Sequence, residues 1–140
     1  MSERRAQILA ELSRLDGATP GQETTIGKHR RMAENPFRFL RGSAQLFYFD
    51  LAGGVLQLPG ALTEAVPLTT VMGDCHISNF GFMTEEGSHG DDVVFAPNDF
   101  DDACIGHAAW DLLRYCSSLF LASDFVAGVN QGRYPPPGDD

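Results

Sequence analysis

The pattern of apolar and polar residues predicts helices in the first and last parts of the chain and short strands between them. Apolar residues recur at the three- and four-residue spacing of an amphipathic helix in several segments. Ser2 and Ser43 begin two of these segments, where a hydroxyl group caps the first turn of a helix. The segments expected to be helical are 2–15, 26–35, 43–53 and 108–125. The apolar stripe of the last segment is expected to comprise Trp110, Leu113, Cys116 and Phe120.

Short runs rich in β-branched and aromatic residues predict strands in the middle of the chain. The expected strands are 68–72, 80–84 and 93–97, and the segment 36–42 alternates like a half-exposed strand or an extended segment. The second and third strands flank a polar turn, so they are expected to pair as a hairpin. A hairpin brings the loop before its first strand and the loop after its second strand to the same end. The polar loops 73–79 and 98–107 are therefore expected to meet.

These two loops carry the side chains that point to chemistry. Asp74, Asn79 and Asp99 lie in them, and the hairpin is expected to bring the three together. Their oxygens are the hard ligands that Mg²⁺ prefers, usually one or two carboxylates with water and substrate phosphates. Phosphoryl transfer needs such metal ligands and one further acceptor that orients the attacking hydroxyl. In this interpretation Asp74 is the base, and Asn79 and Asp99 hold the metal.

Structural alternatives remain open for several of these residues. Asp99, Asp101 and Asp102 place three carboxylates in four residues. Gathering like charges is costly without a cation, but a solvated acidic loop is the alternative. His76 is equally expected to be a loop organiser or a buried structural histidine. A zinc site built from cysteines and histidines is disfavoured because the spacing of Cys75, His76, Cys104 and His107 matches no common zinc motif.

Composition narrows the class of protein. The net charge of −9 is uneven, because residues 1–41 hold eight of the ten Lys and Arg, and residues 42–140 hold fourteen of the nineteen acids. The second part therefore lacks the basic footprint of a nucleic-acid-binding protein. Three cysteines without a CxxC pair indicate a reducing cytoplasm, and no apolar run approaches the length of a membrane span. We expect a cytoplasmic protein with one domain, 1–130, and a disordered tail, 131–140.

The loop motifs also carry a family resemblance. "GDCHISNFGF", followed by "VVFAPNDFDDACIGHAAWDLLRY", resembles the catalytic half of the aminoglycoside-phosphotransferase branch of the protein-kinase-like fold. That branch shows an H-G-D-x-x-x-x-N loop, then an apolar strand, then D-F-x-D-A and G-D-P-x-x-D-L. Together with "RM" and "NPFRFLRG", the motifs are still more similar to an uncharacterised bacterial family, domain of unknown function 2252. The resemblance covers roughly residues 28–120.

The resemblance implies an α+β fragment of a protein-kinase-like fold, with a catalytic loop, a β-hairpin, a metal-binding loop and a following helix. It implies ATP and Mg²⁺ as cofactors, Asp74 as catalytic base, and Asn79 and Asp99 as metal ligands. His76 would organise the catalytic loop, and Asp101 and Asp102 would add charge beside the metal. Asp111 would fix the loop through backbone hydrogen bonds, and Arg114, three residues later, is a candidate partner for Asp111.

Departures from the pattern leave the activity open. Lys28 is the only lysine, and its surroundings do not resemble the strand that presents a phosphate-pairing lysine in kinases. Lys28 and Arg41 are the candidates for phosphate contact, with Arg30 and Arg31 as alternatives. The expected function is phosphoryl transfer from ATP to a hydroxyl of a small molecule or protein. The alternatives are a truncated, non-catalytic kinase-like remnant and a metal-dependent hydrolase.

Overall fold

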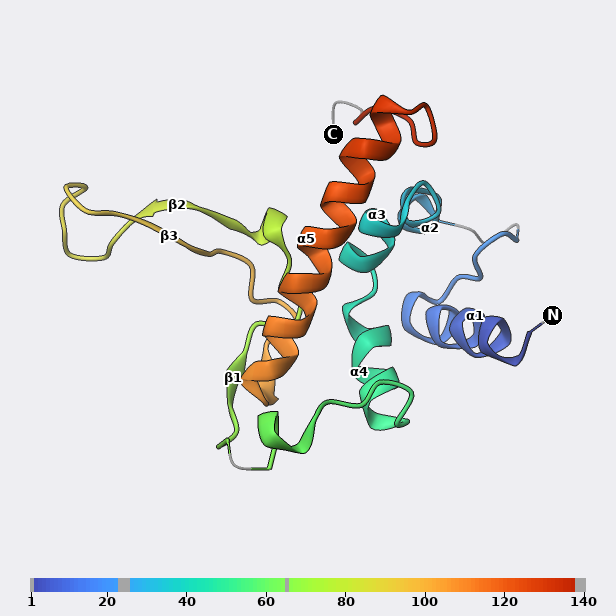
Figure 1. Cartoon of the computed structure of the whole chain (residues 1–140), viewed down its shortest axis with the longest axis horizontal. Helices are drawn as coiled ribbons and strands as arrows, with labels where there is room; N and C mark the ends of the chain where they lie inside the picture. The colour runs from blue at the N-terminus through green and yellow to red at the C-terminus, as the bar shows by residue number, and fades with distance from the viewer. Residues whose placement is uncertain (1, 23–25, 65, 138–140) are drawn as a thin grey trace. The chain divides into compact units, whose positions relative to one another are not determined.

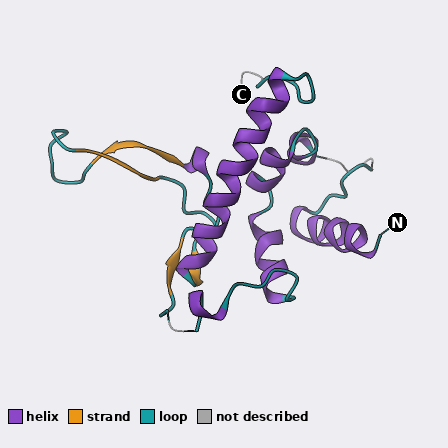
Figure 2. Ribbon diagram, in the orientation of Figure 1, coloured by secondary structure: helices purple, strands orange, loops and turns teal. Residues whose placement is uncertain are grey.

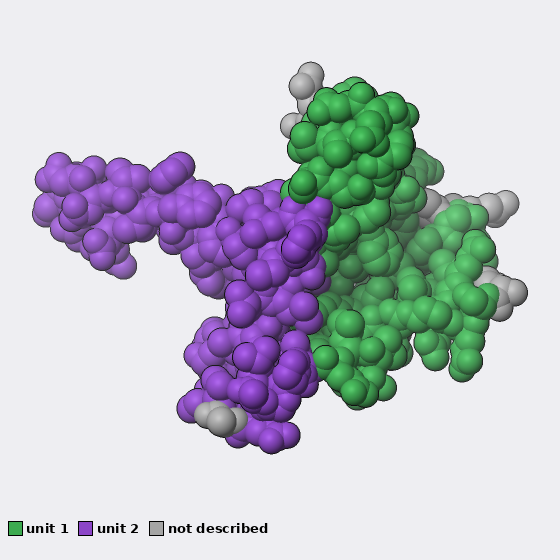
Figure 3. Space-filling model, viewed as in Figure 1, with its two compact units in different colours: residues 1–57, 121–140 green, residues 58–120 purple. Residues whose placement is uncertain are grey.

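The structure, a computed structural model, describes residues 2–22, 26–64 and 66–137 (Figure 1). Along the described chain the helices α1 to α4 come first, short antiparallel strands follow, and the long helix α5 comes last (Figure 2), which confirms the coarse prediction of an α+β fold. The chain divides into two compact units (Figure 3). Unit 1 comprises residues 1–57 and 121–140, and unit 2 comprises residues 58–120. The helix α5 (Ala108–Asn130) contributes its first part to unit 2 and its last part to unit 1.

Unit 1 is helical. Its helices before α5 are α1 (Glu3–Asp16), α2 (Gly27–Met32), α3 (Pro36–Arg41) and α4 (Ala44–Ala52). The predicted helices at 2–15, 26–35 and 43–53 are therefore confirmed, with boundaries shifted by a few residues. The Ser2 hydroxyl accepts a hydrogen bond from the Arg5 amide at 3.4 Å, as the capping prediction requires. The capping prediction is wrong for Ser43, whose hydroxyl caps no amide of α4 and donates instead to the Phe39 carbonyl at 2.6 Å. Both guanidinium NH₂ groups of Arg4 bind the Asp50 carboxylate, which ties α1 to α4.

The prediction of a strand or extended segment at 36–42 is wrong, because this segment forms α3. The side chain of Asn35 accepts a hydrogen bond from the Arg38 amide at 2.9 Å and so caps the helix. Pro36 occupies the first helical position, where its fixed φ and missing amide hydrogen are tolerated. The helix predicted at 26–35 would end at Asn35, whereas in the structure α2 ends at Met32 and Asn35 begins α3.

Unit 2 contains two small antiparallel sheets of two strands each. Strand β2 (Phe80–Thr84) pairs with β3 (Val93–Pro97), with Phe82 opposite Phe95. This is the predicted hairpin, and it is confirmed. Strand β1 (Thr69–Val71) lies within the predicted 68–72 strand and pairs with β4 (Cys104–Gly106).

Strand β4 was not predicted, because the segment 98–107 was expected to be loop throughout. Only three residues, Cys104 to Gly106, pair with β1. A strand this short gives no detectable alternation in the sequence, and its pairing partner lies more than thirty residues earlier in the chain. The pairing therefore comes from tertiary structure.

The predicted helix at 108–125 is confirmed as part of α5, but its expected apolar stripe is not the buried face. Phe120 is 78% exposed and Cys116 is exposed, whereas Ala109, Arg114 and Ser118 are buried. The buried face is partly polar because it binds the backbone and side chains of the 73–79 loop. Among the described residues, α5 is also the one helix long and apolar enough to cross a membrane, with a mean hydropathy of 1.3 over 18 residues, so the expectation that no apolar run approaches this length is wrong. Core helices share these properties, so the absence of a membrane partner stays a prediction.

The predicted disordered tail covers 131–140, of which 138–140 lie outside the described residues. The Arg133 amide donates to the Gly128 carbonyl at 2.7 Å, and the Tyr134 hydroxyl donates to the Asp124 carboxylate at 3.0 Å. The described part of this segment thus turns back on the end of α5.

Candidate functional site

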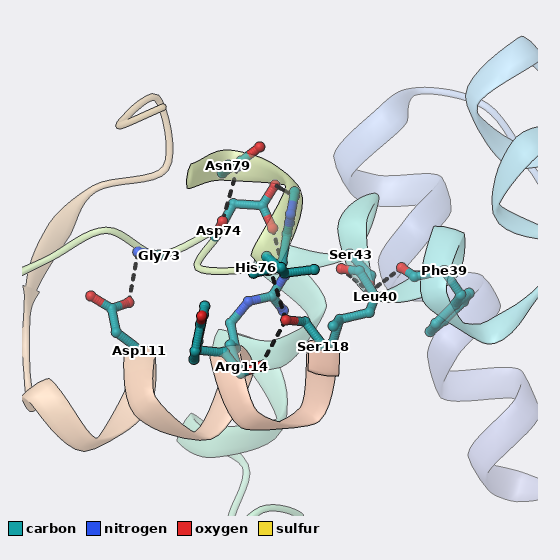
Figure 4. A network of polar contacts seen from close by, with 12 residues as sticks. Phe39, Leu40, Ser43, Gly73, Asp74, His76, Asn79, Asp111, Arg114 and Ser118 are labelled. Atoms are coloured by element: carbon teal, nitrogen blue, oxygen red, sulfur yellow. Dashed lines mark hydrogen bonds and ion pairs between the residues drawn. The ribbon is translucent and has the colours of Figure 1, made fainter. Parts of the chain in front are cut away.

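The loop between β1 and β2 begins with a backbone turn at Gly73. The φ angle of Gly73 is +84°, in the left-handed region that strains residues with a side chain. The turn directs the following residue, Asp74, toward α5 (Figure 4). Glycine before the acid is therefore a conformational requirement of this loop.

Asp74 is held by two cationic or potentially cationic side chains. The Arg114 guanidinium donates to its Oδ1 at 2.6 Å, and His76 Nε2 lies 3.3 Å from its Oδ2. The Asp74 side chain is 18% exposed and that of Arg114 only 1%. Burial acts to raise the pKa of Asp74, but the hydrogen bonds and charges of His76 and Arg114 outweigh it, so the pKa lies below its ordinary value. Asp74 is therefore a carboxylate at neutral pH, the form that accepts a proton.

Asn79 closes the other end of this loop. Its Nδ2 donates to the backbone carbonyl of Asp74 at 3.0 Å, which orients Oδ1 away from the loop (Figure 4). The Asn79 amide donates to the His76 carbonyl at 2.9 Å and completes the 3₁₀ turn η2 (Ile77–Asn79). The loop at 73–79 thus carries both the Asp74 carboxylate and the Asn79 amide oxygen.

The loop after β3 joins the first loop at the backbone. The amide of Asn98 donates to the carbonyl of Asn79 at 3.0 Å. The two loops therefore meet, as the hairpin predicts. Asp99 follows Asn98 directly and is exposed, and its Oδ1 accepts a weak hydrogen bond from the Asp101 amide at 3.4 Å.

The carboxylates after β3 do not form a tight metal cluster. Within residues 2–22, 26–64 and 66–137, no three His, Cys, Asp or Glu side chains are gathered closely enough to hold a metal ion. Asp101 is exposed and Asp102 half-buried. The roles of Asp99, Asp101 and Asp102 stay predictions.

The cysteine of this loop, Cys75, is buried. Burial, together with the charge of Asp111, raises the pKa of the Cys75 thiol to about 11. At neutral pH its side chain is therefore a neutral thiol. Cys75 is a small apolar side chain in the core of unit 2.

Asp111, near the start of α5, binds the backbone directly after β1. Its Oδ2 accepts from the Met72 amide at 2.7 Å, and its Oδ1 accepts from the Gly73 amide at 3.1 Å. These are the backbone hydrogen bonds that the resemblance implied for this residue. Arg114, which the sequence analysis offered as a partner of Asp111, is paired with Asp74.

Sequence reasoning missed one contributor to the loop entirely. Ser118 is fully buried, and its hydroxyl accepts from the Ile77 amide at 3.0 Å and donates to the Tyr115 carbonyl at 2.7 Å. A signal was present in the sequence. Asp111, Arg114 and Ser118 are polar residues at helical spacing in a mostly apolar helix, so they share one face.

The two predicted phosphate-contact residues lie in unit 1. Lys28 Nζ is 2.8 Å from Asp16 Oδ1, and Arg41 is exposed at the end of α3. The pKa of Asp16 is lowered, because Lys28 and His29 outweigh the effect of burial. Phosphate contact by Lys28 and Arg41 stays a prediction.

Comparison with known families identifies the relatives of this chain. The family described as "Uncharacterized protein conserved in bacteria (DUF2252)" matches residues 22–129. The chain belongs to this family. The matched residues include both loops and the polar face of α5, and they confirm the predicted relation to DUF2252. No curated protein and no solved structure matches this DUF2252 chain.

The lowered pKa of Asp74 predicts a pH-dependent stability of the DUF2252 chain. Because the folded pKa is below the unfolded one, the contribution of Asp74 is fully present above about pH 4, the ordinary pKa of Asp, and is lost as pH falls through the folded pKa. Between pH 5 and pH 3, the free energy of unfolding should fall more steeply for the wild type than for Asp74→Asn. Urea unfolding at several pH values measures this, and parallel pH profiles would contradict it.

Proposed function

We propose that this DUF2252 chain transfers a phosphoryl group from ATP to a hydroxyl of a small molecule or protein, with Mg²⁺. The observation that carries the proposal is the hydrogen bond from the Asn98 amide to the Asn79 carbonyl. It joins the loop of the ionised Asp74 to the loop that contains Asp99. The D-x-x-x-x-N motif and the D-F-x-D-A motif thus lie in loops whose backbones are joined, which supports the proposal of a shared site.

The state of Asp74 supports its role as the base. Its carboxylate is ionised at neutral pH and partly accessible. A positioned carboxylate of this kind orients an attacking hydroxyl and accepts its proton as the phosphorus–oxygen bond forms. The ion pair with Arg114 makes Asp74 a weak base, which suits orientation of the hydroxyl with late proton transfer.

Asn79 and Asp99 are the residues that would hold Mg²⁺. The Asn79 amide nitrogen is used within the loop, so its oxygen is the atom presented outward. Asp99 is exposed next to the backbone contact between the loops. One carboxylate and one amide oxygen leave most of the magnesium shell to water and to the ATP phosphates, whose charge the metal would neutralise.

A thermal-shift experiment tests the proposal. Mg²⁺–ATP should raise the melting temperature of the purified chain, because a ligand of the folded state stabilises it by about 2.7 kcal/mol at a hundredfold excess over Kd. Asp99→Ala should abolish the shift, and Asp92→Ala in the hairpin turn, a matched acid outside the site, should retain it. No shift in the wild type, or equal shifts in both variants, would overturn the proposal.

A non-catalytic remnant is the second candidate, and one contact favours it. The only lysine of the chain, Lys28, is engaged by Asp16, so it is not held ready for a nucleotide phosphate. A remnant would fold and show no turnover of ATP. Release of inorganic phosphate without transfer to any acceptor would indicate a hydrolase instead.

A further inference from the structure

We infer that Arg114 and Ser118 of α5 are positioning residues of the proposed site. Arg114 fixes the orientation of the Asp74 carboxylate, and Ser118 fixes the turn that presents Asn79. The catalytic consequence of this inference rests on the proposed function, whereas its structural part rests on the contacts alone. Neither role follows from the motifs, because Arg114 was expected to partner Asp111 and Ser118 lies beyond the last motif residue, Tyr115.

The burial of Arg114 points to orientation of Asp74. A fully buried guanidinium is costly, and an apolar side chain of similar size would fill the same space at lower cost. Arg114 contacts Oδ1 of Asp74 at 2.6 Å, while His76 lies 3.3 Å from Oδ2. With both oxygens contacted, the plane of the carboxylate is fixed, which is what a base with a precise approach direction requires.

Ser118 acts on the second functional residue of the loop. Its hydroxyl accepts from the amide of Ile77, the first residue of η2, and Asn79 is the last residue of that turn. The Ser118 hydroxyl donates its hydrogen to the Tyr115 carbonyl, so its oxygen lone pairs face the loop and accept from it. Ser118 therefore sets the start of the turn from which the Asn79 oxygen projects.

Each of the three polar residues of α5 binds a different part of the segment 72–77. Asp111 holds the amides of Met72 and Gly73, Arg114 holds the carboxylate of Asp74, and Ser118 holds the amide of Ile77. Because these residues lie three and four positions apart, they form one rigid face. A helix face positions side chains more precisely than a loop alone would.

Amide hydrogen exchange, followed by NMR on the full chain, tests the structural part. In Ser118→Ala the Ile77 amide should lose protection by at least tenfold, while the Met72 and Gly73 amides, held by Asp111, should change by less than twofold. Ser117→Ala, the adjacent serine on another face of α5, should leave all three unchanged. Unchanged protection of Ile77 in Ser118→Ala would overturn the assignment of Ser118.

Consumption of ATP with Mg²⁺ tests the catalytic part. Arg114→Lys keeps the charge but has a different geometry, and it should lower kcat at least tenfold while leaving KM for Mg²⁺–ATP within twofold. Arg114→Met should lose activity further, and Arg114→Lys keeps the test valid if the Met variant does not fold. Wild-type kcat in Arg114→Lys would overturn the role of Arg114. A wild type that consumes no ATP would refute the proposed function and this catalytic role, while the exchange data still decide whether the loop is positioned from α5.

Discussion

Replacement of Asp74 by asparagine is expected to lower the rate of ATP consumption about 10²- to 10⁴-fold. Asparagine has nearly the same shape but cannot accept a proton, and a general base contributes a factor of this size. The KM for Mg²⁺–ATP should change little, because Asp74 is assigned to the attacking hydroxyl and not to the nucleotide. Steady-state kinetics with purified wild type and variant measure both parameters.

The control for this prediction is Asp92→Asn, which removes a carboxylate from the exposed hairpin turn. It should leave both kinetic parameters within twofold of the wild type. Circular dichroism should show that Asp74→Asn is folded at the assay temperature. A folded Asp74→Asn with more than a third of the wild-type rate would exclude Asp74 as the base.

Replacement of Asp111 by alanine is expected to lower the free energy of unfolding by about 3–5 kcal/mol. The carboxylate accepts from two backbone amides, and a hydrogen bond to a charged group is worth about 1.5–3 kcal/mol. Met72 and Gly73 are buried, so their amides would find no water in exchange. Urea unfolding at pH 7 measures the change.

Glu86→Ala, an exposed acid in the hairpin turn, is the matched control and should leave the urea midpoint unchanged. A loss below about 1 kcal/mol in Asp111→Ala would mean that the backbone of the loop is held by other contacts. The same experiment would then argue against α5 as the support of the site.

The hairpin shows what the sequence alone could predict. Strands 80–84 and 93–97 are long enough to show β-branched and aromatic enrichment, and the polar turn between them is unambiguous. The meeting of the loops follows from that topology without any knowledge of the rest of the fold. The described Asn98–Asn79 hydrogen bond lies where this reasoning placed the junction.

Short elements escaped prediction because their signals are weak or ambiguous. Strand β4 has three residues, and only β1 as its partner makes it a strand. An Asn-Pro pair is compatible with the end of one helix and with the start of the next. At Asn35–Pro36 a helix begins, because the Asn35 side chain accepts a hydrogen bond from the Arg38 amide. Local sequence does not decide between these outcomes.

The polar residues of α5 that bind the 73–79 loop were the least predictable part of the candidate site. Apolar spacing assigned Cys116 and Phe120 to the core, whereas the buried positions include Arg114 and Ser118. Hydrophobicity ranks these polar residues as exposed, so their burial shows only once the loop that they bind is in place. A polar residue at helical spacing in an apolar helix is therefore a useful indicator of a supported loop.

The central claim is that the loops at 73–79 and 98–103 share one cation site with ATP, and paramagnetic broadening by Mn²⁺ in the presence of ATP tests it most directly. At substoichiometric Mn²⁺, NMR signals of the Asn79 side-chain amide and of the amides of residues 98–100 should disappear first, and Asp99→Ala should abolish this effect. Broadening centred on the acidic turn at 85–92, or spread evenly over the acidic surface, would contradict the account.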